Sequence, residues 1–194
     1  MTVYPAYNGA YANVGQNTGI RATWDSQGIA PPTPFWIAQT FPNQIWIQGG
    51  YYPPGWFYQV WDRTRGLKLA GTTSNKAITP GVHTFEISAQ GKRWRVLIDG
   101  KSIGNYGVGA SVGSGDFLLT NEFSNGTERA LFRDAAALIN GVWVPAPVGS
   151  SYLSGLPALG IAGNLQDAAL PAGTIRIGGT AGVVSDTLLW GTET

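Results

Sequence analysis

Short runs in which apolar and polar residues alternate are separated by clusters of Gly, Pro, Asn and Asp along much of the chain. A period of two, bounded by turn residues, is typical of β-strands that bury one face. The sequence therefore predicts an all-β protein. The clearest predicted strands span residues 20–24, 35–40, 44–52, 82–88, 93–99, 117–123 and 173–179. We expect a loop with at most one weak strand in 62–80, and a strand, a bend and a strand in 130–143.

The segment 35–62 is a dense aromatic block, which we interpret as three short strands joined by Pro and Gly turns. Its central strand alternates so that Trp46, Gln48 and Tyr52 share one face, while two isoleucines share the other. Isoleucines belong in a core, whereas aromatic rings with a polar tip suit a partly wet surface. We therefore expect the Gln48 face to be an open, concave surface lined by aromatic residues.

A second alternating segment, residues 82–99, predicts a hairpin whose apolar residues face the core. Its first strand places His83, Phe85 and Ile87 on one face, and its second does the same with a Trp, a Val and an Ile. His83 is the only histidine of the chain. Since no other histidine is available for a metal site and no nucleophile accompanies it, we interpret His83 as a packed structural residue.

Length and composition limit the possible functions. The 194 residues suffice for one domain, and we expect a single β-sandwich over 1–194 in which 1–19 and 145–194 form arms, edge strands and loops.

Only 12% of residues are charged and the net charge is +1, which offers no basic surface for nucleic acid or a membrane. Few carboxylates favour stability in acid. The absence of cysteine excludes disulfides, thiolate metal sites and a Cys nucleophile, and we expect no metal or other cofactor. We expect a secreted, extracellular monomer whose export signal is not in this chain.

The segments HTFEI and LIDGKSIG, within residues 83–104, resemble the concanavalin A-like lectins and glucanases, which implies a jelly-roll β-sandwich of two antiparallel sheets. A sharper similarity is to the glutamic peptidases of the eqolisin type, which share that sandwich. FWIAQ, WIQGG, WFYQVW and LLTNE stand here in the order of that family's WVGI, ILQTG, WYEWYP and WIVE, over residues 20–124. The chain departs from the family in Gln59, where the aromatic strand has Glu, and in residues 119–121.

The peptidase resemblance implies an acid-acting endopeptidase with Gln48 and Glu122 as its catalytic pair. A carboxylate such as Glu122 takes a proton from attacking water and returns it to the leaving nitrogen. The amide of Gln48 orients that water and donates a hydrogen bond to the developing oxyanion. The predicted substrate-binding residues are Trp36, Trp46, Tyr52, Trp56 and Tyr58, with Trp36 walling the site.

Two functions of other classes stay open. One is a non-catalytic, lectin-like carbohydrate-binding module in which Trp46, Tyr52 and Trp56 stack on sugar rings. The other is a structural or adhesive surface domain, which low charge and ends rich in Tyr, Gly and Asn would suit. A retaining glucanase of this fold commonly carries an E-x-D-x-x-E strand, and calcium-dependent lectins carry clusters of Asp and Asn. The sequence contains neither pattern.

Overall fold

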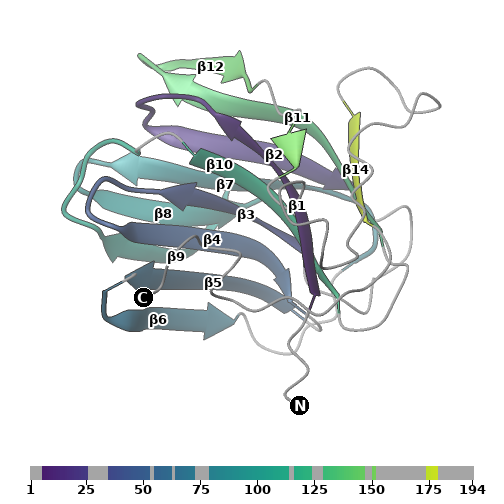
Figure 1. Cartoon of the computed structure of the whole chain (residues 1–194), viewed down its shortest axis with the longest axis horizontal. Coiled ribbons are helices and arrows are strands. Elements are labelled where there is room, and N and C mark those ends of the chain that lie inside the picture. Colours follow the sequence, from purple (N-terminus) through teal and green to yellow (C-terminus); the bar gives the residue numbers. More distant parts are fainter. Residues whose placement is uncertain are drawn as a thin grey trace.

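The protein is a sandwich of two antiparallel β-sheets (Figure 1). The computed structural model describes residues 6–25, 35–52, 55–62, 64–72, 79–113, 116–123, 129–146, 150–151 and 174–178. Every regular element within these ranges is a β-strand. The predicted all-β sandwich of two antiparallel sheets is therefore confirmed.

Each sheet brings together strands that are distant in sequence. The first sheet has the order β13 (Ser150–Ser151), β1 (Ala6–Asn13), β10 (Asp116–Phe123), β3 (Phe35–Thr40), β4 (Ile45–Tyr52), β5 (Gly55–Asp62) and β6 (Gly66–Thr72). The second has the order β12 (Val142–Pro145), β11 (Arg129–Ile139), β2 (Gly19–Asp25), β7 (Val82–Gln90), β8 (Arg93–Ile98) and β9 (Lys101–Gly107), and β14 (Thr174–Gly178) pairs with β11. The aromatic block of the sequence thus forms the β3–β4–β5 half of the first sheet.

The core between the sheets is rich in aromatic rings. Trp24 of β2 is 1% exposed and lies at its centre. Its ring centroid is 5.6 Å from those of Phe35 and Tyr51 and 5.7 Å from that of Phe85. Because these rings come from both sheets, they hold the two layers together.

His83 packs at the rim of this aromatic core, as the sequence predicted. Its ring is 5.9 Å from that of Trp24 and 4.8 Å from that of Trp56. Nδ1 lies 2.8 Å from Oδ2 of Asp99, and Nε2 lies 2.8 Å from the carbonyl oxygen of Thr79. Each ring nitrogen of His83 thus lies within hydrogen-bond distance of an oxygen atom. His83 therefore ties the start of β7 to the end of β8.

The main differences from the sequence-based expectation lie in segments with weak alternation. β1 pairs with β10 on one side and with β13 on the other, so it lies inside the sheet rather than at an edge. β6 is a full strand, and β9 extends the second sheet beyond the predicted hairpin. The bend expected in 130–143 is a register shift within β11 at Asp134, whose φ is 54°, followed by a turn. These segments are strands because their backbones pair with neighbouring strands.

Candidate functional site

Four side chains form a compact block on the outer face of the first sheet, the face turned away from the core. Trp46 of β4 lies directly across from Trp61 of β5, and Gln48 lies directly across from Gln59. The residues between them, including the buried Ile47, point into the sandwich. We call these four residues the Trp–Gln block.

A chain of hydrogen bonds links the Trp–Gln block. Nε1 of Trp46 donates to Oε1 of Gln48 at 3.3 Å, and Nε2 of Gln48 donates to Oε1 of Gln59 at 2.6 Å. Nε1 of Trp61 donates to the same Gln59 oxygen at 3.4 Å. The two indole rings stack with centroids 5.7 Å apart and an angle of 18° between their planes. Each amide is therefore held in one orientation.

The direction of these bonds follows from the indole groups. An indole N–H only donates, so it requires an amide oxygen as its partner and leaves the amide nitrogen on the other side. The Gln59 oxygen receives two donors, while its Nε2 donates to no residue that the structure describes. Gln59 and Trp61 are both partly exposed. The block thus presents N–H donors beside an aromatic ring.

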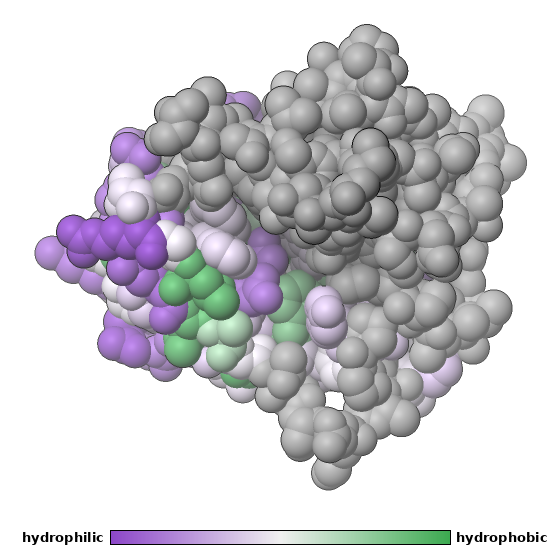
Figure 2. Space-filling model, turned by 60° about the horizontal axis from the view of Figure 1, so that its bottom comes forward, coloured by the Kyte–Doolittle hydropathy of each residue, from purple (hydrophilic) through white to green (hydrophobic). Residues whose placement is uncertain are grey.

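The outer face is not the open groove expected around Gln48. Gln48 is only 7% exposed, Trp46 3% and Trp36 1%, so the β3–β4 part of this face is covered. The accessible part lies over β5 and β6, where Leu67 is 46% exposed. Figure 2 brings this β6 side forward and shows hydrophobic residues beside hydrophilic ones. A ligand would therefore meet Gln59 and Trp61 rather than Gln48.

The strand register separates the predicted catalytic pair. Gln48 aligns through Ala38 of β3 with Leu118 of β10, and Glu122 lies four residues further along β10. With strands about 4.8 Å apart and a rise of about 3.4 Å per residue, the two Cα atoms are roughly 16 Å apart. The structure does not bring Gln48 and Glu122 together.

The predicted substrate-binding residues divide between the two faces of the first sheet. Trp36, Trp46 and Tyr52 share the outer face with Gln48, and Tyr52 is 47% exposed. Trp56 and Tyr58 alternate with the outer-face residues of β5 and point inward. Trp56 packs 5.9 Å from the core ring of Phe85. These two residues are therefore not placed to share a ligand with Gln48.

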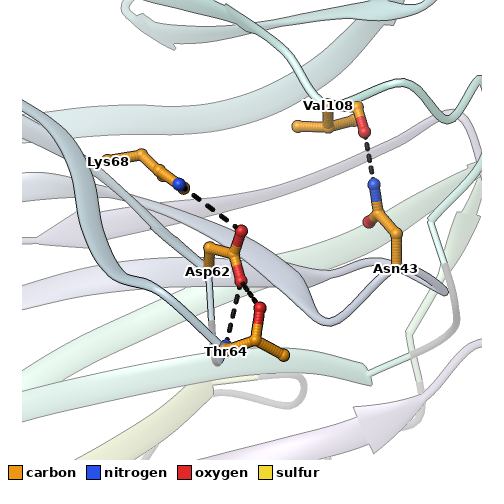
Figure 3. Close-up of polar contacts among 5 residues, drawn as sticks. All are labelled: Asn43, Asp62, Thr64, Lys68 and Val108. Carbon is orange, nitrogen blue, oxygen red and sulfur yellow. Dashed lines mark hydrogen bonds and ion pairs between the residues drawn. The ribbon is translucent and has the colours of Figure 1, made fainter.

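The hairpin turn after β5 holds the end of the strand that carries Trp61. Oδ1 of Asp62 accepts from the backbone N–H of Thr64 at 2.9 Å and from its hydroxyl at 2.6 Å, and Lys68 Nζ lies 3.7 Å from Oδ2 (Figure 3). Nearby, the amide of Asn43 donates to the carbonyl oxygen of Val108 and ties the β3–β4 turn to the other sheet. The turns at this end are thus anchored by side chains.

The same contacts make the turn sensitive to acid. The hydroxyl of Thr64, above all, lowers the pKa of Asp62, and the Thr64 N–H, Lys68 and Arg65 add to this lowering against the opposing effect of burial. Because the pKa of Asp62 is lower in the folded protein than in the unfolded chain, the unfolded chain binds the proton at a higher pH. The stability contributed by Asp62 is therefore present above the ordinary carboxyl pKa of about 4 and is lost as the pH falls through the folded value.

We predict that Thr64→Val reduces the loss of melting temperature between about pH 5 and pH 2, because it removes the main cause of the pKa shift. Thr64→Ser keeps the hydroxyl and should behave as the parent protein. Thermal unfolding followed by circular dichroism at each pH measures this. Identical pH profiles for the Val and Ser variants would contradict the prediction.

The structure offers no metal centre among the residues it describes, since no three His, Cys, Asp or Glu side chains of those ranges gather to hold an ion. Within the same ranges, no helix has the length and apolar character needed to cross a bilayer.

Several solved structures show a distant likeness to this chain. No family model and no curated protein sequence matches the chain. The galectin LEC-6 of Caenorhabditis elegans is 10% identical with a TM-score of 0.41, covering 63% of this chain and 88% of its own. Sheep galectin-11, solved in complex with glycerol, is 12% identical with a TM-score of 0.36, covering 62% and 91%. SCLam, a non-specific endo-beta-1,3(4)-glucanase of family GH16, is 13% identical with a TM-score of 0.34, covering 64% and 50%.

At such identities and TM-scores, these likenesses carry no argument about family, ligand or activity, and they give no support to the glutamic peptidase resemblance. On the described part of the first sheet, the Trp–Gln block is a polar group whose side chains hold one another through hydrogen bonds.

Proposed function

We propose that this protein binds an uncharged carbohydrate on the outer face of β5 and β6. The observation that carries the proposal is the pairing of a partly exposed indole, Trp61, with the amide nitrogen of Gln59, which donates to no residue that the structure describes. The stack on Trp46 and the bond from Gln48 hold both groups in place before a ligand arrives. A preorganised site loses little conformational entropy on binding.

The chemistry of a sugar ring matches these two groups. One face of a pyranose is lined by C–H bonds that pack on an aromatic ring, and its rim carries hydroxyl oxygens that accept hydrogen bonds. The Trp–Gln block contains no acidic or basic side chain. In the hairpin beside it, Asp62 and Lys68 lie 3.7 Å apart, and Arg65 also acts on the Asp62 carboxylate. The uncharged stacking and hydrogen-bonding groups of the block itself suit a neutral saccharide.

We predict that Trp61→Ala abolishes measurable binding and that Gln59→Glu weakens it by about tenfold. Alanine removes the stacking surface, while glutamate keeps the oxygen that Gln48 needs but loses the N–H donors. A neutral-glycan array followed by calorimetry on the best ligand provides the measurement. The matched control is Trp143→Ala, which removes a partly exposed tryptophan from the second sheet and should leave binding unchanged.

Saturable binding that survives both Trp61→Ala and Gln59→Glu would place the ligand elsewhere and reject this site. The peptidase function is not part of the proposal, because the register keeps Gln48 and Glu122 apart. Peptide hydrolysis in acid that is lost in Glu122→Gln would contradict that exclusion.

A further inference from the structure

Two neighbouring polar side chains on the outer face of the second sheet have buried atoms without a hydrogen-bond partner. Ser88 of β7 lies directly across from Arg95 of β8. The Ser88 hydroxyl oxygen and Arg95 Nε are both buried, and neither has a partner among the described residues. Ser88 is only 5% exposed. Buried donors are normally satisfied, so two of them side by side indicate a missing acceptor.

A third donor group stands on the other side of Ser88. A Cβ atom at Gly19, which pairs with Ser88, would lie 3.2 Å from the Ser88 Cβ and 3.3 Å from Cη2 of Trp143. The Trp143 ring and the Ser88 side chain therefore both lie over Gly19. Arg21 lays its guanidinium on this ring, with Cζ 4.3 Å from the centroid. Stacking occupies the flat face of a guanidinium and leaves its N–H edge to bind a ligand.

The charges around these donors favour an anion. Arg93 shares the outer face with Arg95 two residues along β8, and its Nε donates to Oδ1 of Asn105 at 3.1 Å. Glu86 lies directly across from Arg21 and forms no ion pair with any described residue. Three guanidinium groups thus stand near one carboxylate. Like charges on neighbouring strand positions destabilise a sheet unless an opposite charge lies between them.

We infer that Ser88, Arg95 and Arg21 form a binding site for an oxyanion, the carboxylate or sulfate group carried by a small free anion or by an acidic sugar. Its oxygens accept hydrogen bonds from Arg95 Nε, from the Ser88 hydroxyl and from the edge of Arg21. Charge-assisted bonds of this kind are the strong ones, and guanidinium groups match planar or tetrahedral oxyanions. The site lies on the opposite side of the sandwich from the Trp–Gln block and does not depend on the function proposed there.

The test is a titration with sodium sulfate at constant ionic strength, followed through the arginine Nε–H resonances by NMR. We expect the Arg95 resonance to shift and saturate, while that of Arg93, already bonded to Asn105, stays in place. Ser88→Ala should weaken sulfate binding by about tenfold, and Arg95→Met should abolish it. Arg133→Met removes an exposed arginine of β11 and serves as the matched control, with unchanged binding.

An unsaturable shift common to all arginines, or equal binding by the Ser88→Ala and parent proteins, would show that only water fills the gap and would overturn the inference. A second titration measures the affinity for a sulfated disaccharide, with its unsulfated parent as the blank, and compares it with the affinity for free sulfate. Tighter binding of the sulfated disaccharide than of free sulfate supports the site and identifies an acidic sugar as the ligand. Equal affinity for the sulfated disaccharide and free sulfate supports the site and identifies the free anion.

Discussion

Trp24→Ala is expected to lower the free energy of unfolding by about 3 to 5 kcal/mol, the range found when a buried tryptophan is truncated. Trp24 is 1% exposed, and its ring contacts aromatic rings of both sheets, including those of Phe35 and Phe85. Removing it leaves a cavity that neighbouring rings cannot fill without leaving their rotamers. Urea unfolding followed by tryptophan fluorescence and circular dichroism measures the change.

Trp143→Ala is the matched control for this loss, because it removes the same side chain from a partly exposed position on the edge strand β12. We expect it to cost about 1 kcal/mol, because it removes one partly exposed cation–π contact with Arg21 and leaves the core intact. Equal destabilisation by the two variants would mean that the rings around Trp24 do not form the centre of the core.

Gly50→Ala is expected to destabilise the protein by about 3 kcal/mol or more, the upper part of the range for overpacking. A Cβ atom at Gly50 would lie 2.2 Å from the carbonyl oxygen of Phe35 and 2.7 Å from Cα of Trp36. Both are backbone atoms of β3, so no side-chain rotation relieves the contact. The pairing of β3 with β4 must open, and the Trp–Gln block on β4 should lose its geometry with it.

The control for Gly50 is Gly107→Ala, because a Cβ at Gly107 would meet only Arg93 Nη1 at 3.7 Å. Its melting temperature should stay close to that of the parent, whereas that of Gly50→Ala falls by several degrees. A Gly50→Ala protein with the parent's melting temperature would show that β3 and β4 are further apart than the structure places them.

The alternation of β4 predicted its faces correctly because the two faces differ chemically. Ile47 points into the core and Gln48 points out, as the pattern indicates. β5 has no such contrast, since Trp56 faces inward and Trp61 outward. Hydropathy does not distinguish the two faces of β5, because both carry aromatic residues. The pairing of Gln48 with Gln59 shows which face of β5 is the outer one. The importance of Gln59 and Trp61 therefore becomes visible only with the cross-strand register.

The separation of Gln48 from Glu122 has a similar cause. The order of motifs along a chain predicts which strands are near one another, but the offset between β10 and β4 depends on the pairing of each with β3. A shift of two residues moves a side chain by about 7 Å without changing its face. β1 was difficult to place for a related reason, because its pairing with β10 and β13 joins residues that are far apart in sequence.

The hydrogen-bond chain of the Trp–Gln block has a consequence for how ligand preference could evolve. Gln59 leaves its amide nitrogen free of these bonds because Gln48 and Trp61 both donate hydrogen bonds to its oxygen. If Gln48 were replaced by an acceptor such as Glu, Gln59 would turn its amide nitrogen toward that residue and expose its carbonyl oxygen, giving up the 3.4 Å bond from Trp61 Nε1. A substitution at the buried residue 48 would then change the exposed group of Gln59 from a hydrogen-bond donor to an acceptor. The ligand would meet this change although Gln59 itself is not substituted.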